Sequence, residues 1–118
     1  MLNIEVIKNK GSFQTVAVKD FVEGEVVLII TGKETLVRDR YTIQLKPDLH
    51  IIPDQFSGKY VNHSCLPNSK VNCNREFVAL REIKEGDELT FDYKSTEDEL
   101  AEKFKCNCGN SNCRGIIQ

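Results

Sequence analysis

Three of the chain's five cysteines gather near its C-terminal end, where Cys106, Cys108 and Cys113 form a C-x-C-x4-C cluster. Turn-forming Gly, Asn and Ser residues separate them, and such turns let neighbouring sulfurs converge on one point. A closed disulfide framework would leave one of five thiols over, whereas a tetrahedral zinc site takes four. The cluster therefore predicts a zinc site. The upstream candidates for its fourth ligand are Cys65, Cys73, His63 and His50.

The chain has 118 residues, the size of one compact domain with a modest core. Its formal net charge of -2 lacks the excess of positive charge that binding to a phosphate backbone requires, so we expect no direct nucleic-acid partner. The longest apolar run, Val26 to Ile30, is far shorter than a membrane-spanning helix, and the N-terminus lacks the pattern of an export signal. We expect a soluble intracellular protein of the cytoplasm or nucleus, without membrane contact; the composition does not bear on its oligomeric state.

Two stretches resemble each other, V-A-V-K-D-F-V-E-G-E from Val16 and V-A-L-R-E-I-K-E-G-D from Val78. Each reads as a strand, a turn and a second strand, with Gly24 or Gly86 free to take a positive φ in the turn. Further strands are expected at residues 3–7, 41–45 and 69–73. The predicted fold class is therefore mostly β with short helices.

One segment after these strands has a helical pattern. Ser95 or Thr96 can cap it, and the acidic residues that follow suit a first helical turn. Leu100 and Phe104 form an apolar i,i+4 pair, and Lys105 favours the C-terminal end of a helix. The pattern predicts a helix that ends at Lys105 and leads the chain into the cysteine cluster.

The middle of the chain packs polar groups, a thiol and a proline into the run N-H-S-C-L-P-N at residues 62–68. One interpretation is enzymatic, with Cys65 as nucleophile and His63 as its base. We expect no direct contact between these two side chains, which weighs against this interpretation. The other interpretation is a polar turn whose Asn and Ser side chains satisfy loop backbone groups, and the residues alone favour it.

Three motifs, in this order, resemble one family. N-H-S-C-L-P-N at 62–68, E-L-T-F-D-Y at 88–93 and C-N-C-G-N-S-N-C-R-G at 106–115 are similar to the SET-domain family of protein lysine methyltransferases. The stretch at 17–27 resembles the family's N-terminal strands, and the last motif resembles its post-SET zinc segment. The resemblance implies a minimal SET domain at residues 1–94, followed at residues 95–118 by a post-SET helix and zinc-binding segment within the same structural unit.

The resemblance also implies a β-clip-like fold with a pseudoknot. The segment from Asn62 to Cys65 would thread beside the strand end that carries Tyr93, and Asn68 would brace the threaded loop. Tyr93 would be the catalytic hydroxyl at the methyl-transfer centre. The zinc ligands would be Cys65, Cys106, Cys108 and Cys113.

By the same resemblance, the cofactor is S-adenosylmethionine and the substrate is a lysine ε-amine of a protein or peptide, possibly histone-like. Phe91 and Tyr41 would line the channel for the target lysine. The residues that would bind the cofactor are Asn62, His63, Gly11, Phe13 and Tyr60.

One departure from the family pattern bears on activity. SET domains usually carry a G-x-G pattern before the first repeated strand, where this chain has Gly11-Ser12-Phe13-Gln14. The Cβ atoms of Ser12 and Gln14 would crowd the cofactor or force another backbone path, unless Gly11 compensates. An alternative function is therefore a catalytically weak or inactive SET-like binding module. A zinc-stabilised nucleic-acid binder is a third hypothesis, which the acidic charge disfavours.

Overall fold

The computed structural model of the chain describes residues 3–9, 11–39, 41–72, 74–97, 104–105 and 113–117. These residues form mostly short β-strands, which confirms the predicted fold class. The helical elements among them are single turns, the π-helical η1 (Gln55–Lys59) and the 3-10 helix η2 (Tyr93–Ser95). The strands are β1 (Ile4–Asn9), β2 (Ser12–Ala17), β3 (Val26–Ile29), β4 (Gly32–Thr35), β5 (Ile43–Lys46), β6 (Leu49–Pro53), β7 (Asn62–His63), β8 (Ser69–Val71), β9 (Glu76–Ala79), β10 (Thr90–Phe91), β11 (Phe104–Lys105) and β12 (Ile116–Ile117).

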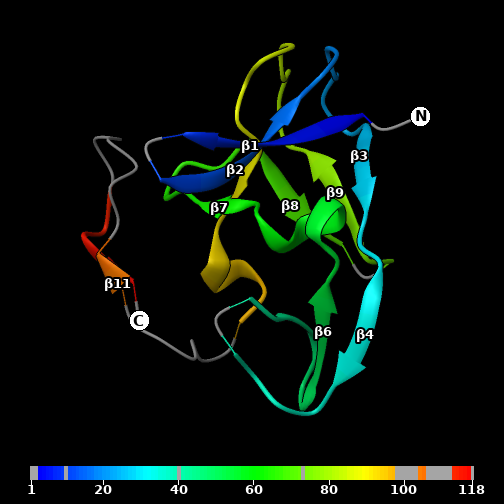
Figure 1. The fold of residues 1–118 in the computed structure, drawn as a ribbon, viewed down its shortest axis with the longest axis vertical. Helices are drawn as coiled ribbons and strands as arrows, with labels where there is room; N and C mark the ends of the chain where they lie inside the picture. Colours follow the sequence, from blue (N-terminus) through cyan, green and yellow to red (C-terminus); the bar gives the residue numbers. More distant parts are fainter. Residues whose placement is uncertain are drawn as a thin grey trace.

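The strands form several small sheets instead of one large one (Figure 1). β1 and β2 form an antiparallel hairpin near the top of the view, and β4–β6–β5 form a three-stranded sheet at the bottom. A second three-stranded sheet, β3–β9–β8, lies between them, and β11 pairs with β12. The pair that departs from this antiparallel scheme is β7 with β10, which run parallel.

The three further strands predicted from the sequence are confirmed as β1, β5 and β8, with shifted ends. β5 begins at Ile43 and not at Tyr41 because the Asp39 carboxylate accepts hydrogen bonds from the backbone N–H groups of Tyr41 and Thr42, at 2.7 and 3.0 Å. This side-chain turn holds the chain out of the strand for two residues. β8 ends at Val71, and Cys73 lies outside the described residues.

The two repeated stretches pair with each other. Phe21 donates its N–H to the carbonyl of Ile83 at 2.7 Å, and Ile83 returns the bond to Phe21 at 2.9 Å. These two residues occupy the same position in the two repeats. Further backbone bonds repeat this pattern. The N–H of Gly86 donates to the carbonyl of Ala17, and the N–H of Gly24 to that of Ala79, both at 2.8 Å. The N–H of Ala17 donates to the carbonyl of Asp87, and the N–H of Ala79 to that of Glu25, both at 2.9 Å. The repeats are therefore related by a local two-fold arrangement centred on Phe21 and Ile83.

The predicted turns at the end of each repeat are confirmed. Gly24 has a φ of +86° and Gly86 a φ of +90°, in the left-handed region that glycine adopts without strain. The side chains of Phe21 and Ile83 are fully buried between the repeats, in a core to which most of the strands contribute. None of the helical elements in the described part of the chain is long and apolar enough to cross a membrane.

The predicted helix is wrong at its C-terminal end. Phe104 and Lys105 belong to β11, which pairs antiparallel with β12, so the chain is extended there. At the start, the chain forms only η2, whose cap is Asp92, and Leu100 lies outside the described residues. Pairing with the distant C-terminal strand outweighs the weak local helix preference of Phe104 and Lys105.

Replacing Phe21 with alanine should destabilise the protein by about 3 to 5 kcal/mol, because it leaves a cavity where the two repeats meet. The free energy of unfolding can be measured by urea denaturation. Val22→Ala is the matched control, since the neighbouring Val22 side chain is 64% exposed. The control should change the unfolding free energy by less than about 0.5 kcal/mol. Equal decreases in the free energy of unfolding of both variants would contradict the importance of Phe21 packing between the repeats.

Candidate active site

The parallel pairing of β7 with β10 brings two distant sequence motifs together. Asn62 lies opposite Thr90 and His63 opposite Phe91, and the N–H of Ser64 continues the ladder to the carbonyl of Phe91 at 3.1 Å. The predicted closeness of the segment Asn62–Cys65 to the strand end before Tyr93 is therefore confirmed.

Asn68 braces the loop beside this crossing, as predicted. Its side-chain amide donates to the carbonyl of Glu88 at 2.8 Å, and its Oδ1 accepts the backbone N–H of Thr90 at 2.9 Å. Ser69 adds a 2.6 Å bond from its hydroxyl to the carbonyl of Thr90. Asn68 is 7% exposed, so these bonds replace hydration that the buried backbone groups have lost.

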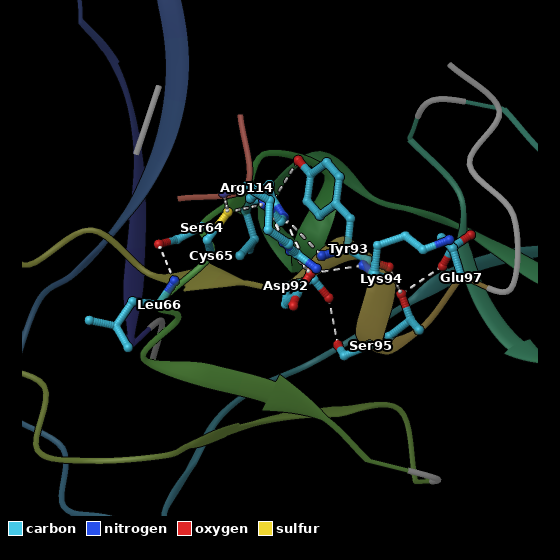
Figure 2. Close-up of polar contacts among 12 residues, drawn as sticks. Ser64, Cys65, Leu66, Asp92, Tyr93, Lys94, Ser95, Glu97 and Arg114 are labelled. Atoms are coloured by element: carbon cyan, nitrogen blue, oxygen red, sulfur yellow. Dashed lines mark hydrogen bonds and ion pairs between the residues drawn. The ribbon is translucent and has the colours of Figure 1, made fainter. Parts of the chain in front are cut away.

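Tyr93 is held from both ends at this crossing (Figure 2). Its phenol Oη donates to the carbonyl of Val61 at 3.2 Å, and its backbone N–H donates to Nδ1 of His63 at 3.1 Å. Its ring packs against the Phe91 ring, with centroids 4.9 Å apart. The Tyr93 residue is half-buried, and its hydrogen bond to Val61 and its packing on Phe91 fix the orientation of the ring.

The His63 imidazole is a structural part of this arrangement. Its side chain is 2% exposed, and burial lowers the pKa of the imidazole below its usual value; Asp92 opposes this shift and Arg114 adds to it. Because Nδ1 accepts the Tyr93 N–H, the neutral ring carries its proton on Nε2. That nitrogen faces Sγ of Cys65 at 3.5 Å.

The expectation that His63 and Cys65 make no direct contact is wrong, because side chains two residues apart on extended backbone lie on the same face. β7 ends at His63, and the chain bends at Cys65 and Leu66, where the Ser64 hydroxyl accepts the Leu66 N–H at 3.1 Å. The sulfur also accepts a backbone N–H from Arg114 at 3.3 Å, which makes it part of a junction between chain segments.

The C-terminal segment is fastened to this junction by Arg114. Its guanidinium forms an ion pair with Asp92 at 2.7 Å, next to Tyr93, while its backbone N–H contacts Cys65 (Figure 2). Cys113 immediately precedes Arg114, so two of the predicted zinc ligands belong to adjoining parts of the structure. Cys106 and Cys108 lie outside the described residues. Among the residues that the structure describes, no group of three or more His, Cys, Asp or Glu side chains is arranged to hold a metal.

The predicted cofactor and channel aromatics form a second cluster, next to the first. Phe13 stacks on Tyr60 with centroids 4.7 Å apart, and Tyr41 meets Tyr60 edge-on at 6.3 Å. The side-chain amide of Asn62 joins the clusters, since it donates to the carbonyl of Phe13 at 3.0 Å. Phe13 is 42% exposed and Tyr41 39% exposed, so the rings border solvent.

Phe91, the other residue predicted for the lysine channel, lies in the core. It is 4% exposed, and its ring meets the Phe77 ring edge-on at 5.2 Å and the Tyr93 ring at 4.9 Å. Phe91 therefore packs against the Tyr93 ring from the core, and its effect on a channel would pass through that contact.

The glycine departure leaves the backbone regular. Gly11 occupies the β1–β2 turn with a φ of +83°. Ser12 and Gln14 are ordinary residues of β2, paired with Asn9 and Ile7. Of the two, Ser12 is exposed and Gln14 half-buried. The strand therefore follows a path that needs no glycine at either position, and no left-handed backbone is forced on a side chain.

Sequence reasoning missed several residues of this region. Lys59 has its ammonium 5.2 Å from the centroid of the Tyr41 ring and 5.4 Å from that of Tyr60. Glu88 accepts the side-chain amide of Asn62 at 2.9 Å. A basic residue beside an aromatic one is a weak signal for Lys59, whereas the half-buried Glu88 opens the E-L-T-F-D-Y motif, which by itself assigns it no partner.

Fold and site together define a mostly β domain in which a polar loop crosses a strand end that carries a fixed phenol. The family model for the SET domain matches residues 8–94. The chain therefore belongs to the SET-domain family.

Known proteins that are similar to this chain support its assignment to this family. The chain is 43% identical over 61 residues to Methyltransferase flvH of Aspergillus flavus, covering 49% of this chain and 34% of that protein. It is 42% identical over 90 residues to the Histone-lysine N-methyltransferase, H3 lysine-4 specific, of Schizosaccharomyces pombe, covering 69% of this chain and 10% of that protein. The crystal structure of KRYPTONITE with mCHH DNA, H3(1-15) peptide and SAH matches all of this chain and 30% of that one, with a TM-score of 0.75 and 23% identity. The chain thus spans about a third or less of the length of these proteins, and the structural match establishes the shared fold.

Asn68→Ala should lower the free energy of unfolding by about 2 to 4 kcal/mol, because it leaves the Glu88 carbonyl and the Thr90 N–H buried without partners. Asn68→Asp is the matched comparison, since a carboxylate still accepts from Thr90 but cannot donate to Glu88. The free energy of unfolding of Asn68→Asp should lie between the values for wild type and Asn68→Ala. Both values come from urea denaturation, and an alanine variant as stable as wild type would show that the brace is dispensable.

Proposed function

We propose that this chain is an S-adenosylmethionine-dependent protein lysine methyltransferase. The observation that carries the proposal is the Tyr93 phenol, fixed beside the Asn62–His63 strand in a domain of the SET family. The similarity to a histone-lysine N-methyltransferase over 69% of the chain supports the same activity. We also propose that the loop at 62–68 forms the family's pseudoknot. The hydrogen bonds of the Asn68 side chain to the backbone of Glu88 and Thr90 support this proposal.

The aromatic cluster fits the cofactor chemically. An adenine ring stacks well on exposed aromatic faces such as those of Phe13 and Tyr60, and a carboxylate pairs well with an ammonium such as that of Lys59. Open space around the Cβ direction of Gly11 leaves room at the hairpin turn. We therefore assign cofactor binding to Gly11, Phe13, Tyr60, Asn62 and His63, with Lys59 added from the structure.

When bound, S-adenosylmethionine supplies a methyl group on a positively charged sulfur. The chain's own residues must deliver a neutral amine to it. A lysine has a pKa of about 10.4 in water, so its deprotonation at pH 7 costs about 4 to 5 kcal/mol. Once a bound peptide covers Tyr41, the aromatic side chains of Tyr93 and Tyr41 would lower this cost, because they would exclude water and disfavour the ammonium form.

Tyr93 acts by position. Its phenol is anchored to the Val61 carbonyl, so the oxygen has a fixed direction in which to orient the incoming amine. An ordinary phenol has a pKa near 10 and is hardly ionised at neutral pH, which argues against a role as a strong base. Phe91 packs against the Tyr93 ring, and by likeness to the family we propose that it affects how many methyl groups are added.

We further propose that Cys65, Cys106, Cys108 and Cys113 bind one zinc ion. The contact of the Arg114 N–H with Cys65 supports this set, because it brings the residue after Cys113 to the Cys65 sulfur. Thiolates are the preferred ligands of structural zinc, and N–H donors to them stabilise their charge. On this assignment, residues 1–94 form the SET domain and residues 95–118 a post-SET segment that the metal fastens beside Tyr93.

The substrate class follows from the proposed reaction. We propose a lysine-containing protein or peptide, with histones as the first class to test because the fission-yeast relative is a histone-lysine methyltransferase. A soluble protein of the cytoplasm or nucleus would meet such substrates. The net charge of -2 favours a basic peptide over direct contact with nucleic acid.

Tyr93→Phe should reduce methyl transfer by about tenfold or more, since it removes the oxygen that orients the amine but keeps the ring. Transfer of a radiolabelled methyl group to a panel of basic peptides measures the rate, and calorimetry should show unchanged S-adenosylmethionine binding. Val22→Ala, an exposed change outside the proposed site, is the control and should leave methyl transfer unchanged. Equal activity of wild type and Tyr93→Phe would reject the role of the phenol. A wild-type chain that binds no cofactor would favour the noncatalytic binding module.

Cys108→Ser should release the zinc, because a four-sulfur site loses affinity when one thiolate becomes a hydroxyl. The zinc content per chain, measured by elemental mass spectrometry, should fall from about one to well below one. Cys73→Ser should keep its zinc, since Cys73 is outside the proposed set. The opposite pattern would replace Cys108 by Cys73 in the ligand set.

A further inference from the structure

Glu97 is a buried carboxylate. Neither the predicted helix nor the proposed set of catalytic residues explains its burial. The sequence pattern places it in the first turn of an exposed helix, yet the residue is 8% exposed. It follows η2 and lies at the far end of the turn that begins with Tyr93 (Figure 2). Burial of a carboxylate is costly unless hydrogen bonds compensate for the lost water, so its contacts need an explanation.

The carboxylate spans two parts of the chain that are far apart in sequence. Its Oε2 accepts the backbone N–H of Gln44 at 2.8 Å, in a buried position, and the hydroxyl of Thr96 at 2.6 Å. Gln44 belongs to β5, which is an edge strand of the β4–β6–β5 sheet. The Gln44 N–H therefore has a side-chain carboxylate as its partner at a strand edge.

The backbone of Glu97 is tied to Tyr93. The carbonyl of Tyr93 accepts the N–H of Glu97 at 3.0 Å and the N–H of Thr96 at 3.3 Å. These bonds close the turn, so the position of the Glu97 side chain follows that of Tyr93. One carboxylate thus connects the catalytic turn to the edge of β5.

β5 begins two residues after Tyr41, whose ring contacts the Tyr60 ring edge-on. The bond from Glu97 to Gln44 therefore links the turn that carries Tyr93 to the strand that follows Tyr41. If Tyr93 and Tyr41 both line the proposed lysine channel, these two segments must be held at one separation for the side chain to lie in line with a methyl donor. A displacement of about 1 Å can cost a hundredfold in rate.

We propose that Glu97 is a positioning residue for methyl transfer, whose carboxylate clamps the edge of β5 to the Tyr93 turn and sets the separation of Tyr93 from the Tyr41–Tyr60 pair. This role rests on the proposed methyltransferase function. Glu97 touches neither the cofactor aromatics nor the phenol, so it acts through the segments that it joins.

Glu97→Ala should lower kcat/KM for a methylated peptide substrate by about tenfold or more, while the Kd for S-adenosylmethionine changes less than about twofold. Glu97→Gln keeps an amide oxygen that can accept from Gln44, so it should recover to within about threefold of wild type. Glu85→Ala is the matched control, since Glu85 is exposed on the second repeat turn, and it should leave kcat/KM unchanged. Rescue by glutamine separates an acceptor at this position from a general loss of stability.

Hydrogen exchange of the Gln44 amide, followed by NMR, tests the clamp without any activity. The amide should be protected in wild type and in Glu97→Gln and should exchange at least about tenfold faster in Glu97→Ala. Unchanged protection in Glu97→Ala, or full activity in that variant, would overturn the clamp. A glutamine variant as slow as alanine despite a protected Gln44 amide would do the same. If wild type transfers no methyl group, the proposed function fails and the role in transfer fails with it, whereas the exchange data still decide whether the contact exists.

Discussion

The short parallel contact between β7 and β10 is the constraint on which the rest of the site depends. Parallel strands cannot be joined by a tight turn, so the chain between them must travel a long way before it returns. Here residues 64–89 make that excursion and contain β8, β9 and the second repeat. The return places Thr90 and Phe91 beside β7, with the Asn68 side chain bonded to Glu88 and Thr90. Every contact of Tyr93 with His63 and Val61 follows from this placement.

The exchange of hydrogen bonds between the two repeats supplies the stable base for that crossing. Leu89, which comes directly before β10, donates its N–H to the carbonyl of Thr15 in β2 at 2.8 Å, while the Thr15 hydroxyl donates to the carbonyl of Tyr60 at 2.9 Å. The hairpin that carries Phe13 is thereby held against both the crossing and the aromatic cluster. Stability of the core and alignment of the site are consequently coupled through the same strands.

Three acidic side chains near Tyr93 have structural tasks, although their spacing in the sequence suggests a solvated, charged face. Asp92 pairs with Arg114 and also caps η2 by accepting the Lys94 N–H at 3.0 Å. Glu88 holds the amide of Asn62, and Glu97 holds the edge of β5. Each connects Tyr93 or its strand to a different segment. Carboxylates suit this work because each oxygen accepts more than one bond, which lets one side chain join several donors.

The amino-acid sequence alone was sufficient for the β-rich class, the two repeats with their glycine turns, and the motifs that resemble the SET family. These features depend on local preferences and on ordered residue patterns, which are present in the linear chain. The contact of Cys65 with the Arg114 backbone, the extended backbone at Phe104 and Lys105, and the burial of Glu97 were decided by tertiary structure. In each case the deciding partner lies far along the chain: Arg114 for Cys65, β12 for Phe104 and Lys105, and Gln44 for Glu97. A local pattern carries no information about such partners, because the free energy that fixes these residues arises only when distant segments meet.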